Sequence, residues 1–311
     1  MEILFFVFGL TLLLIGATGI INSSVLIGNK FRISPLIIGI TAIAIGTSLP
    51  EITIAIFSSI DNTPDLALGN ILGSNIVNIG LIFGISLFSG LNIGTYKTQT
   101  NSLISLLISI SFFILLLFNY LGLIAGFFML LIGFFLLKFQ IKQGYIENLI
   151  KNKVINSKKT MPKSKQLILF LYFIISLLSL IFGGKLTVDY GIILASLLEI
   201  PQLVIGITVI AIGTSLPELT ISIIGLIKKQ EKLVIGNILG SNIFNILFGG
   251  GILGLYNFNS YSNNSITYTF FIFFSLFLSF LLYIFKGKRM NKFFGFVFIA
   301  IYIVYLYLLL T

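Results

Sequence analysis

The sequence predicts an all-α membrane protein of ten transmembrane helices, built as two inverted five-helix repeats with broken helices at the membrane midplane. Three observations lead to this prediction: an apolar composition, ten long apolar runs and an internal repeat. Of the 311 residues, 57% are hydrophobic and only 9% are charged. A water-soluble domain carries about 25% charged residues, so we expect the lipid bilayer to surround this chain.

The composition also excludes several functions. The chain has no His, Cys or Trp, which excludes disulfides, zinc or haem bound through His or Cys, and catalysis by Cys or His. We therefore expect no cofactor. A net charge of +10 suggests a nucleic-acid partner at first sight, but membrane topology explains the charge better. The start of the chain, Met1–Leu4, lacks the positive residues of a cleaved signal peptide, so the first apolar run is interpreted as a retained span.

Ten runs reach the length of about 20 apolar residues that a membrane-spanning helix needs. The fourth and fifth are separated only near Asn119 and Tyr120, so these two could be miscounted. The longest polar stretch, 139–166, is rich in Lys and Asn, and we expect it to be a basic cytoplasmic linker between a first repeat, 1–138, and a second repeat, 167–311. The predicted spans are residues 3–21, 36–58, 66–89, 101–118, 120–138, 167–185, 203–227, 233–255, 266–285 and 293–310.

The placement of basic residues supports the count of ten spans. With ten spans, 18 of the 19 Lys and Arg residues fall in connections on one side of the membrane, and only Lys185 falls on the other. Basic connections face the cytoplasm, so both termini are predicted to lie outside. One missed or extra span would distribute the basic residues over both sides of the membrane.

The internal repeat has a constant offset of 167 residues. The segment Gly46–Glu51, with the letters GTSLPE, returns unchanged as Gly213–Glu218. Five spans is an odd number, so the second copy enters the membrane upside down. Inverted repeats are a transporter architecture, with the substrate site near the midplane where broken helices meet. The other aligned blocks are Leu36–Thr41 with Leu203–Thr208, and Gly69–Ile76 with Gly236–Ile243.

Glu51 and Glu218 are the only two of the nine acidic residues that fall in the middle of a predicted span. An intramembrane carboxylate costs at least about 2.5 kcal/mol even on insertion scales, so by default it marks function. The alternative is a structural carboxylate paired with a basic residue, but no Lys or Arg lies mid-span to pair with it.

A helix break is predicted before each carboxylate. Pro50 has no N–H, so the Gly46 carbonyl loses its helical partner, and the carbonyls near Ala44 need another partner in hydrocarbon. A cation can be that partner. Thr47 and Ser48 precede Glu51 by four and three residues, so all three can share one face. A simple proline kink is the alternative, but the same polar set recurs around Pro217, with Thr214 and Ser215.

Polar stripes on two further spans extend this pattern. The third span carries Asn70, Ser74 and Asn78 at steps of four, and the eighth carries Asn237, Ser241 and Asn245. Gly69 and Gly73, like Gly236 and Gly240, leave room for close helix approach. The stripes can either bind a ligand or hydrogen-bond neighbouring helices. We favour ligation for Ser74, Asn78, Ser241 and Asn245, and leave both interpretations open for Asn70, Asn75, Asn237 and Asn242.

All of these candidate ligands are oxygen atoms, which suit hard cations. Calcium takes 6–8 oxygen ligands at about 2.3–2.6 Å, and Na⁺ is similar in size. Two carboxylates carry a charge of −2, which one Ca²⁺, or two or more Na⁺, would neutralise. An empty site leaves two like charges in low dielectric, where their interaction energy is large. Such a site should resist crossing while empty, which is a physical basis for obligatory exchange.

Together, GTSLPE in each half and the following GN-x-x-GSN-x-x-N resemble the sodium/calcium exchanger family of the cation/calcium exchanger superfamily, prokaryotic type. The resemblance covers most of the chain. It implies antiport of Ca²⁺ against about three Na⁺ by alternating access, with the first and sixth spans sliding past the other eight. It also implies that the central carboxylates are Glu51 and Glu218, with hydroxyl or carbonyl ligands from Thr47, Ser48, Thr214 and Ser215, backbone ligands from Ala44 and Ala211, outer sodium ligands from Ser74 and Ser241, and polar positions at Asn78 and Asn245.

One position departs from part of the family. Some prokaryotic relatives and the potassium-dependent exchangers carry Asp where this chain has Asn245. The neutral side chain argues against K⁺ cotransport. It also leaves the site at −2, so exchange of one Ca²⁺ for about three Na⁺ would move net charge.

Three other functions are weighed. A Ca²⁺/H⁺ antiporter of the same superfamily is the nearest alternative, because a buried carboxylate readily takes up a proton. A cation channel would gather its ligands by oligomeric symmetry, whereas here one chain supplies two halves. An intramembrane hydrolase needs two carboxyl groups with different proton affinities, whereas the two copies are identical, so no enzyme is expected.

The expected partners are Ca²⁺, Na⁺ and the lipid bilayer, with H⁺ as the alternative coupling ion and no nucleic acid. The linker is interpreted as a topology determinant, with lipid headgroup contact as the alternative. It is too short for a regulatory calcium-binding domain and lacks Asp clusters, so no cytosolic calcium regulation is expected. We expect a multi-pass protein of a prokaryotic plasma membrane that functions as a monomer.

Overall fold

The computed structural model of the chain describes residues 1–31, 33–62, 64–91, 96–154, 163–197, 211–256, 265–286 and 288–310. Within these ranges the regular structure is helical and no β-strand occurs, which confirms the predicted all-α class. The second copy of one repeated block, residues 203–208, lies outside the described residues.

Eight described helices are long and apolar enough to cross a membrane, and the count is nine if the pair Pro35–Thr47 and Leu49–Ile60 is one broken span. Each overlaps a predicted run, although α1 continues to Phe31 beyond the predicted end at residue 21, and α9 continues to Leu197 beyond the predicted end at residue 185. The predicted run 203–227 is described only as α11 (Ala211–Thr214) and α12 (Leu216–Ile227). The eight are α1 (Glu2–Phe31), α5–η2–α6 (Pro64–Leu87), α7 (Tyr96–Leu117), α8 (Leu123–Val154), α9 (Lys163–Leu197), α13–η4–α14 (Glu231–Leu255), α15 (Ser265–Ile284) and α16 (Lys292–Leu310).

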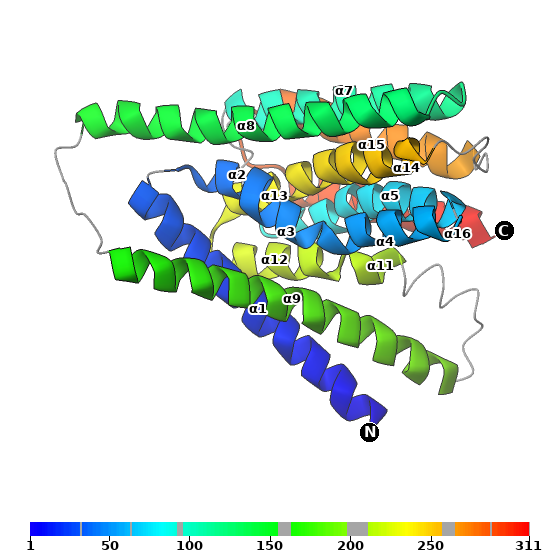
Figure 1. Cartoon of the computed structure of the whole chain (residues 1–311), viewed down its shortest axis with the longest axis horizontal. Helices are drawn as coiled ribbons and strands as arrows, with labels where there is room; N and C mark the ends of the chain where they lie inside the picture. Colours follow the sequence, from blue (N-terminus) through cyan, green and yellow to red (C-terminus); the bar gives the residue numbers. More distant parts are fainter. Residues whose placement is uncertain are drawn as a thin grey trace. The chain divides into compact units, whose positions relative to one another are not determined.

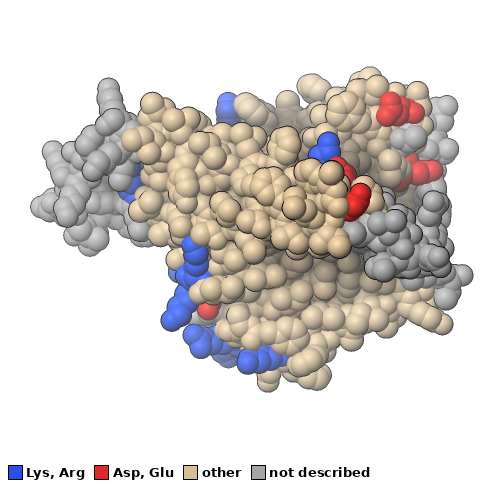
Figure 2. Space-filling view, turned by 90° about the horizontal axis from the view of Figure 1, so that it is seen from below, with Lys and Arg blue, Asp and Glu red and all other residues tan. Residues whose placement is uncertain are grey.

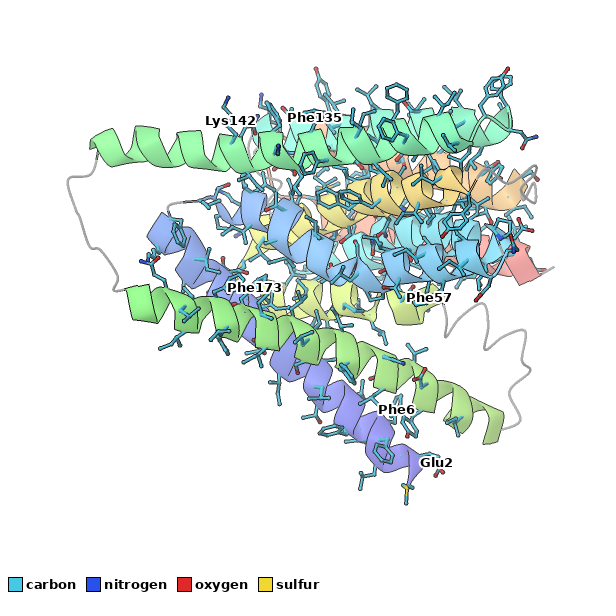
Figure 3. All side chains as sticks on the ribbon, in the orientation of Figure 1. Glu2, Phe6, Phe57, Phe135, Lys142 and Phe173 are labelled. Atoms are coloured by element: carbon cyan, nitrogen blue, oxygen red, sulfur yellow. The ribbon has the colours of Figure 1, made fainter. Side chains whose placement is uncertain are left out.

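Two connections refine the sequence prediction. The fourth and fifth runs are separate helices, because α7 ends at Leu117, α8 begins at Leu123 and Asn119 between them has a φ of 53°. The predicted linker 139–166 is partly helical, since α8 continues to Val154 and α9 begins at Lys163. Lys142 is exposed on this extension of α8 (Figure 3).

The chain forms two compact units. Unit 1 comprises Met1–Thr47 and Leu136–Asn237, and unit 2 comprises Ser48–Phe135 and Ile238–Thr311. Each unit draws on both halves of the sequence, so the units do not coincide with the repeats, whose boundaries remain a prediction. The boundary between Thr47 and Ser48 falls inside the repeated GTSLPE segment.

In unit 1, α1 and α9 cross each other and are in extensive contact (Figure 1). Their contact is close because small residues face it: a methyl group on Gly16 would lie 2.5 Å from the Leu180 backbone nitrogen. Phe5 and Tyr190 stack with ring centroids 4.8 Å apart. The buried core between α1, α9 and α12 includes Leu13, Ala17, Ile20, Ile21, Leu180 and Ile221.

A second close crossing in unit 1 joins Gly39 and Gly236. Gly39 begins the π-helical segment η1 (Gly39–Ile43), which follows α2 (Pro35–Ile38) and leads into α3 (Ala44–Thr47). A methyl group on Gly39 would collide with the Leu233 carbonyl, and one on Gly236 would collide with the Leu36 carbonyl. These are backbone atoms with no freedom to move away, so this crossing requires glycine on both sides. The prediction of close helix approach is confirmed at Gly236 and is wrong at Gly69 and Gly73, where no described atom of a neighbouring helix comes within 4 Å of an added methyl group.

In unit 2, α4 (Leu49–Ile60) packs on α5 (Pro64–Val77), η4 (Asn245–Gly250) and α14 (Gly251–Leu255), while α7 packs on α15 (Figure 1). Helix α16 packs on η2 (Asn78–Phe83) and α6 (Gly84–Leu87). Phe83 and Phe298 meet edge to face with centroids 5.3 Å apart. Ser102 Oγ donates to Ser279 Oγ at 2.9 Å, which ties α7 to α15.

The outer surface is apolar, as a bilayer requires. Phe57 on α4 and Phe135 on α8, both labelled in Figure 3, are 59% and 58% exposed. Figure 2 shows a face made mainly of uncharged residues. In water such a surface would be an aggregation hazard, whereas in lipid it is the ordinary exterior of a spanning helix.

Candidate cation-binding residues

The two GTSLPE segments have the same backbone form. The first helix half, α3, ends at Thr47, Ser48 is non-helical, and α4 begins at Leu49 with Pro50 in its first turn. In the second copy, α11 ends at Thr214 and α12 begins at Leu216. The φ and ψ angles are −81° and 1° at Ser48, and −90° and 9° at Ser215. The predicted helix break at each proline is confirmed.

The break explains how each carboxylate is tolerated. Glu51 and Glu218 lie in the first turn of α4 and α12, and both are 0% exposed. The beginning of a helix carries partial positive charge, which stabilises a nearby carboxylate. The end of the preceding half-helix presents carbonyl oxygens without helical N–H partners. Half-helix ends of this kind coordinate Na⁺ in secondary transporters.

In unit 1, the polar side chains gather around α3, α12 and the start of α13. Thr47 Oγ1 lies 3.3 Å from both the Ala44 carbonyl and Asn237 Oδ1. Asn237 is 0% exposed, and its Nδ2 has no hydrogen-bond partner among the described residues. Because α3 packs against α12, the structure brings Ala44 and Thr47 close to the helix that carries Glu218. The Gly39–Gly236 crossing holds this arrangement, since it lies next to Asn237.

In unit 2, the polar side chains gather around α4, α5 and η4, which contact one another. Asn70 Nδ2 donates to the Glu51 carbonyl at 3.4 Å, and Asn78 Nδ2 donates to Asn242 Oδ1 at 3.0 Å. The predicted ligands here are all buried: Ser48 0%, Glu51 0%, Ser74 1%, Asn78 0%, Ser241 0% and Asn245 0% exposed.

Several of these buried oxygens lack hydrogen-bond partners within the described part of the chain. They are Ser48 Oγ and Ser215 Oγ, Asn78 Oδ1, and Asn245 Oδ1. Buried polar atoms are nearly always satisfied in native proteins, and each exception needs an explanation. Bound cations would be suitable partners for such oxygens, because hydroxyl and amide oxygens are the ligands that Ca²⁺ and similar hard ions prefer. The described residues hold no cluster of three or more His, Cys, Asp or Glu that could bind a metal, so neutral oxygens would complete the coordination.

Two features of the site were not predicted from the sequence. Asn78 and Asn245 each begin a π-helical segment, η2 and η4. Such segments are rare and frequently mark functional sites. The only sequence hint is a polar residue followed by glycines, Gly80 and Gly249. The second feature is the hydrogen bonding of Asn237 and Asn242, whose roles the sequence left open.

The predicted site residues thus fall into two sets, one in each unit. Unit 1 holds Ala44, Thr47, Ala211, Thr214, Ser215 and Glu218, and unit 2 holds Ser48, Glu51, Ser74, Asn78, Ser241 and Asn245. Backbone broken at membrane depth is tolerated where it is buried in protein or lines a cavity. Long apolar helices, two broken helices and buried carboxylates at the breaks together define a multi-pass helical membrane protein of the transporter class.

Comparison with known proteins gives the family. The sequence profile described as "Sodium/calcium exchanger protein" matches residues 1–142 and 168–311, so the chain belongs to the sodium/calcium exchanger family. It is 34% identical over 302 residues to the uncharacterized membrane protein MJ0091 of Methanocaldococcus jannaschii, covering 96% of this chain and 95% of that protein.

Two further matches agree. The chain is 29% identical to the sodium/calcium exchanger MaX1 of Methanosarcina acetivorans, over 97% of this chain and 96% of that one. A solved structure of the sodium–calcium exchanger NCX_Mj, soaked with Na⁺ and Sr²⁺, matches with a TM-score of 0.83 and 30% identity, over 97% of this chain and 96% of the other. The family resemblance inferred from the GTSLPE segments is confirmed.

Proposed function

We propose that the protein is a secondary antiporter that exchanges Ca²⁺ for Na⁺ by alternating access. The observation that carries the proposal is the duplicated helix break, in which a fully buried carboxylate lies four residues after a half-helix end. Membership of the sodium/calcium exchanger family supports it, as do the names of MaX1 and NCX_Mj. The protein is a transporter rather than an enzyme, and its ligands are the ions it carries.

The proposed ion ligands are the twelve residues predicted from the sequence. Glu51 and Glu218 supply the charge, and hydroxyl, amide and backbone oxygens supply the rest. The buried oxygens without hydrogen-bond partners support this assignment. The neutral ligands are Ala44, Thr47, Ser48, Ser74, Asn78, Ala211, Thr214, Ser215, Ser241 and Asn245.

Charge sets the expected coupling. The two carboxylates carry −2, and Asn245 adds nothing. One Ca²⁺ gives a neutral complex, whereas about three Na⁺ give +1, so we propose electrogenic exchange without K⁺. We further propose ten spans in two inverted repeats, 1–138 and 167–311, joined by the basic segment 139–166, with both termini outside a prokaryotic plasma membrane and a functional monomer. The distribution of Lys and Arg supports this topology.

Flux measurements in proteoliposomes test the function. An outward Na⁺ gradient should drive uptake of radiolabelled calcium into vesicles that contain the purified protein, and a K⁺ gradient should not. Collapse of the membrane potential should change the uptake rate, because the exchange moves net charge. Absence of Na⁺-driven uptake by the wild-type protein would rule the proposal out.

A Ca²⁺/H⁺ antiporter is the second candidate. The observation that favours it is the complete burial of Glu51 and Glu218, since a buried carboxyl group is a ready proton carrier. The same vesicles distinguish the two candidates when a pH gradient replaces the Na⁺ gradient. Uptake driven by the pH gradient alone would establish the proton as the coupling ion.

A further inference from the structure

We propose that Asn242 is a positioning residue for the ion site, because its hydrogen bond to Asn78 turns the Asn78 amide oxygen toward the cation. The inference rests on the proposed function, in which Asn78 is an ion ligand. It assigns a role to a residue that is outside the twelve predicted ligands. It also distinguishes two residue pairs, Asn78–Asn242 and Asn75–Asn245, that the repeated sequence presents as equivalent.

The argument starts from the Asn78 side chain. Its Nδ2 donates to Asn242 Oδ1 at 3.0 Å, and the two residues are 0% and 1% exposed. Asn78 Oδ1 is buried and has no hydrogen-bond partner within the described ranges. An amide group has one acceptor oxygen and one donor nitrogen, and only the oxygen binds a hard cation. A hydrogen bond that engages the nitrogen therefore directs the oxygen elsewhere.

The opposite orientation of Asn78 would be unfavourable. If its amide turned over, Asn78 Oδ1 would face Asn242 Oδ1, so two acceptors would meet in a buried region and the hydrogen bond would be lost. Unsatisfied polar groups are costly in such surroundings. Asn242 thus holds a neutral ligand in its binding orientation, as outer partners do in metal sites. A carboxylate ligand would not need this help, because both of its terminal atoms are oxygen.

The equivalent pair, Asn75 and Asn245, lacks this hydrogen bond. At the repeat offset of 167 residues, Asn75 corresponds to Asn242 and Asn245 corresponds to Asn78. Asn75 Nδ2 donates instead to the Ile71 carbonyl of its own helix at 2.7 Å. Asn75 Oδ1 and both amide atoms of Asn245 have no hydrogen-bond partner in the described part of the chain. All four asparagines lie in unit 2, so the two pairs are compared within one compact unit.

The position of each asparagine suits this role. Asn78 and Asn245 are the first residues of the π-helical segments η2 and η4, and Asn75 and Asn242 lie three residues earlier, on α5 and α13. The contact between Asn78 and Asn242 therefore joins the start of η2 to α13. An interhelical hydrogen bond that only stabilises the fold is the competing explanation, and the two explanations predict different behaviour for the ion.

The experiment uses full-length protein with four substitutions. Asn242→Leu removes the acceptor. We expect it to raise the calcium concentration for half-maximal Na⁺-driven uptake by about tenfold, with the maximal rate largely retained. Asn75→Leu is the matched control at the equivalent position, and we expect a smaller shift, of about twofold, because Asn75 does not hold Asn245 in this structure. Thermal unfolding of each purified variant reports any loss of stability.

The decisive variant adds Asn78→Asp. Either oxygen of the new carboxylate can bind the ion, so Asn242→Leu should cause no further shift in a chain that already carries Asn78→Asp. Asn242→Asp, which keeps an acceptor oxygen, should retain more affinity than Asn242→Leu. If Asn242→Leu shifts the calcium dependence equally with and without Asn78→Asp, or lowers only the unfolding temperature, Asn242 is a structural residue and the inference is wrong. If the wild-type protein does not transport calcium at all, the proposed function itself fails.

Discussion

The two helix breaks have the same sequence and nearly the same backbone angles but different neighbours. At the first break, Asn70 is partly exposed and donates to the Glu51 carbonyl. Asn237, which corresponds to Asn70 in the repeat, is fully buried and also contacts the first break, because its Oδ1 lies 3.3 Å from Thr47 Oγ1. The comparison shows that the repeated segment determines the backbone conformation of the break, whereas the surrounding helices determine which side chains contact it.

Local chemistry accounts for the similarity. Pro50 and Pro217 lack an N–H, so each must occupy the first turn of a new helix, and the residue before that helix leaves the helical conformation in both copies. Packing accounts for the difference. A methyl group on Gly46 would lie 2.7 Å from Leu177, and one on Gly213 would lie 2.5 Å from Val188, so α9 contacts both copies through different side chains.

The largest effect should come from the carboxylates. Glu51→Gln and Glu218→Gln keep the side-chain size but remove the charge, so each should reduce Na⁺-driven calcium uptake to roughly a hundredth of wild type or less. Similar losses would show that the two breaks are equivalent in chemistry despite their different neighbours. Glu231→Gln, at the start of α13, is the matched control and should transport normally. A variant at position 51 or 218 with undiminished uptake would remove that carboxylate from the site.

The next effect concerns close packing. Gly39→Ala should destabilise the protein by about 1–3 kcal/mol, because its methyl group would collide with the Leu233 backbone. Gly69→Ala should have little effect, since no described atom beyond the adjacent residues and backbone of its own helix lies within 4 Å of a methyl group placed there. Thermal unfolding in detergent compares the two variants. Equal unfolding temperatures would show that the Gly39–Gly236 crossing does not constrain the fold.

The smallest effect concerns a difference between the two copies one helical turn after the carboxylates. Ser222 follows Glu218 by four residues, whereas Ala55 occupies the equivalent position after Glu51. Ser222 is 1% exposed, and its hydroxyl has no hydrogen-bond partner among the described residues. Ser222→Ala should therefore be neutral or stabilise the protein by about 1 kcal/mol, with calcium uptake unchanged. A clear loss of uptake at normal stability would instead place Ser222 on the ion path.

Much of the fold was predictable because it depends on local features of the chain. Apolar runs and prolines determine where a spanning helix begins, ends and breaks, and the described helices follow them from α1 to α16. Burial was less predictable. Leu107 and Phe112 lie in one apolar run, yet they are 64% and 1% exposed, because both lipid and protein core accept apolar side chains.

The candidate site was also predictable only where it depends on local features of the chain. Glu51 and Glu218 stood out because a carboxylate in an apolar run is rare. The π-helical turns at Asn78 and Asn245, and the hydrogen bond from Asn78 to Asn242, depend on the packing of distant helices. No pattern within one span reports such contacts. The sequence therefore indicated candidate ligands by residue type but not which of their amide groups form hydrogen bonds.

Calorimetric titration of the purified protein with calcium, in the absence and presence of Na⁺, tests the central claim most directly. If Glu51 and Glu218 bind both ions, wild-type protein should bind calcium, Na⁺ should weaken that binding, and Glu51→Gln should abolish it. Calcium binding that is insensitive to Na⁺ and unchanged in Glu51→Gln would contradict the account.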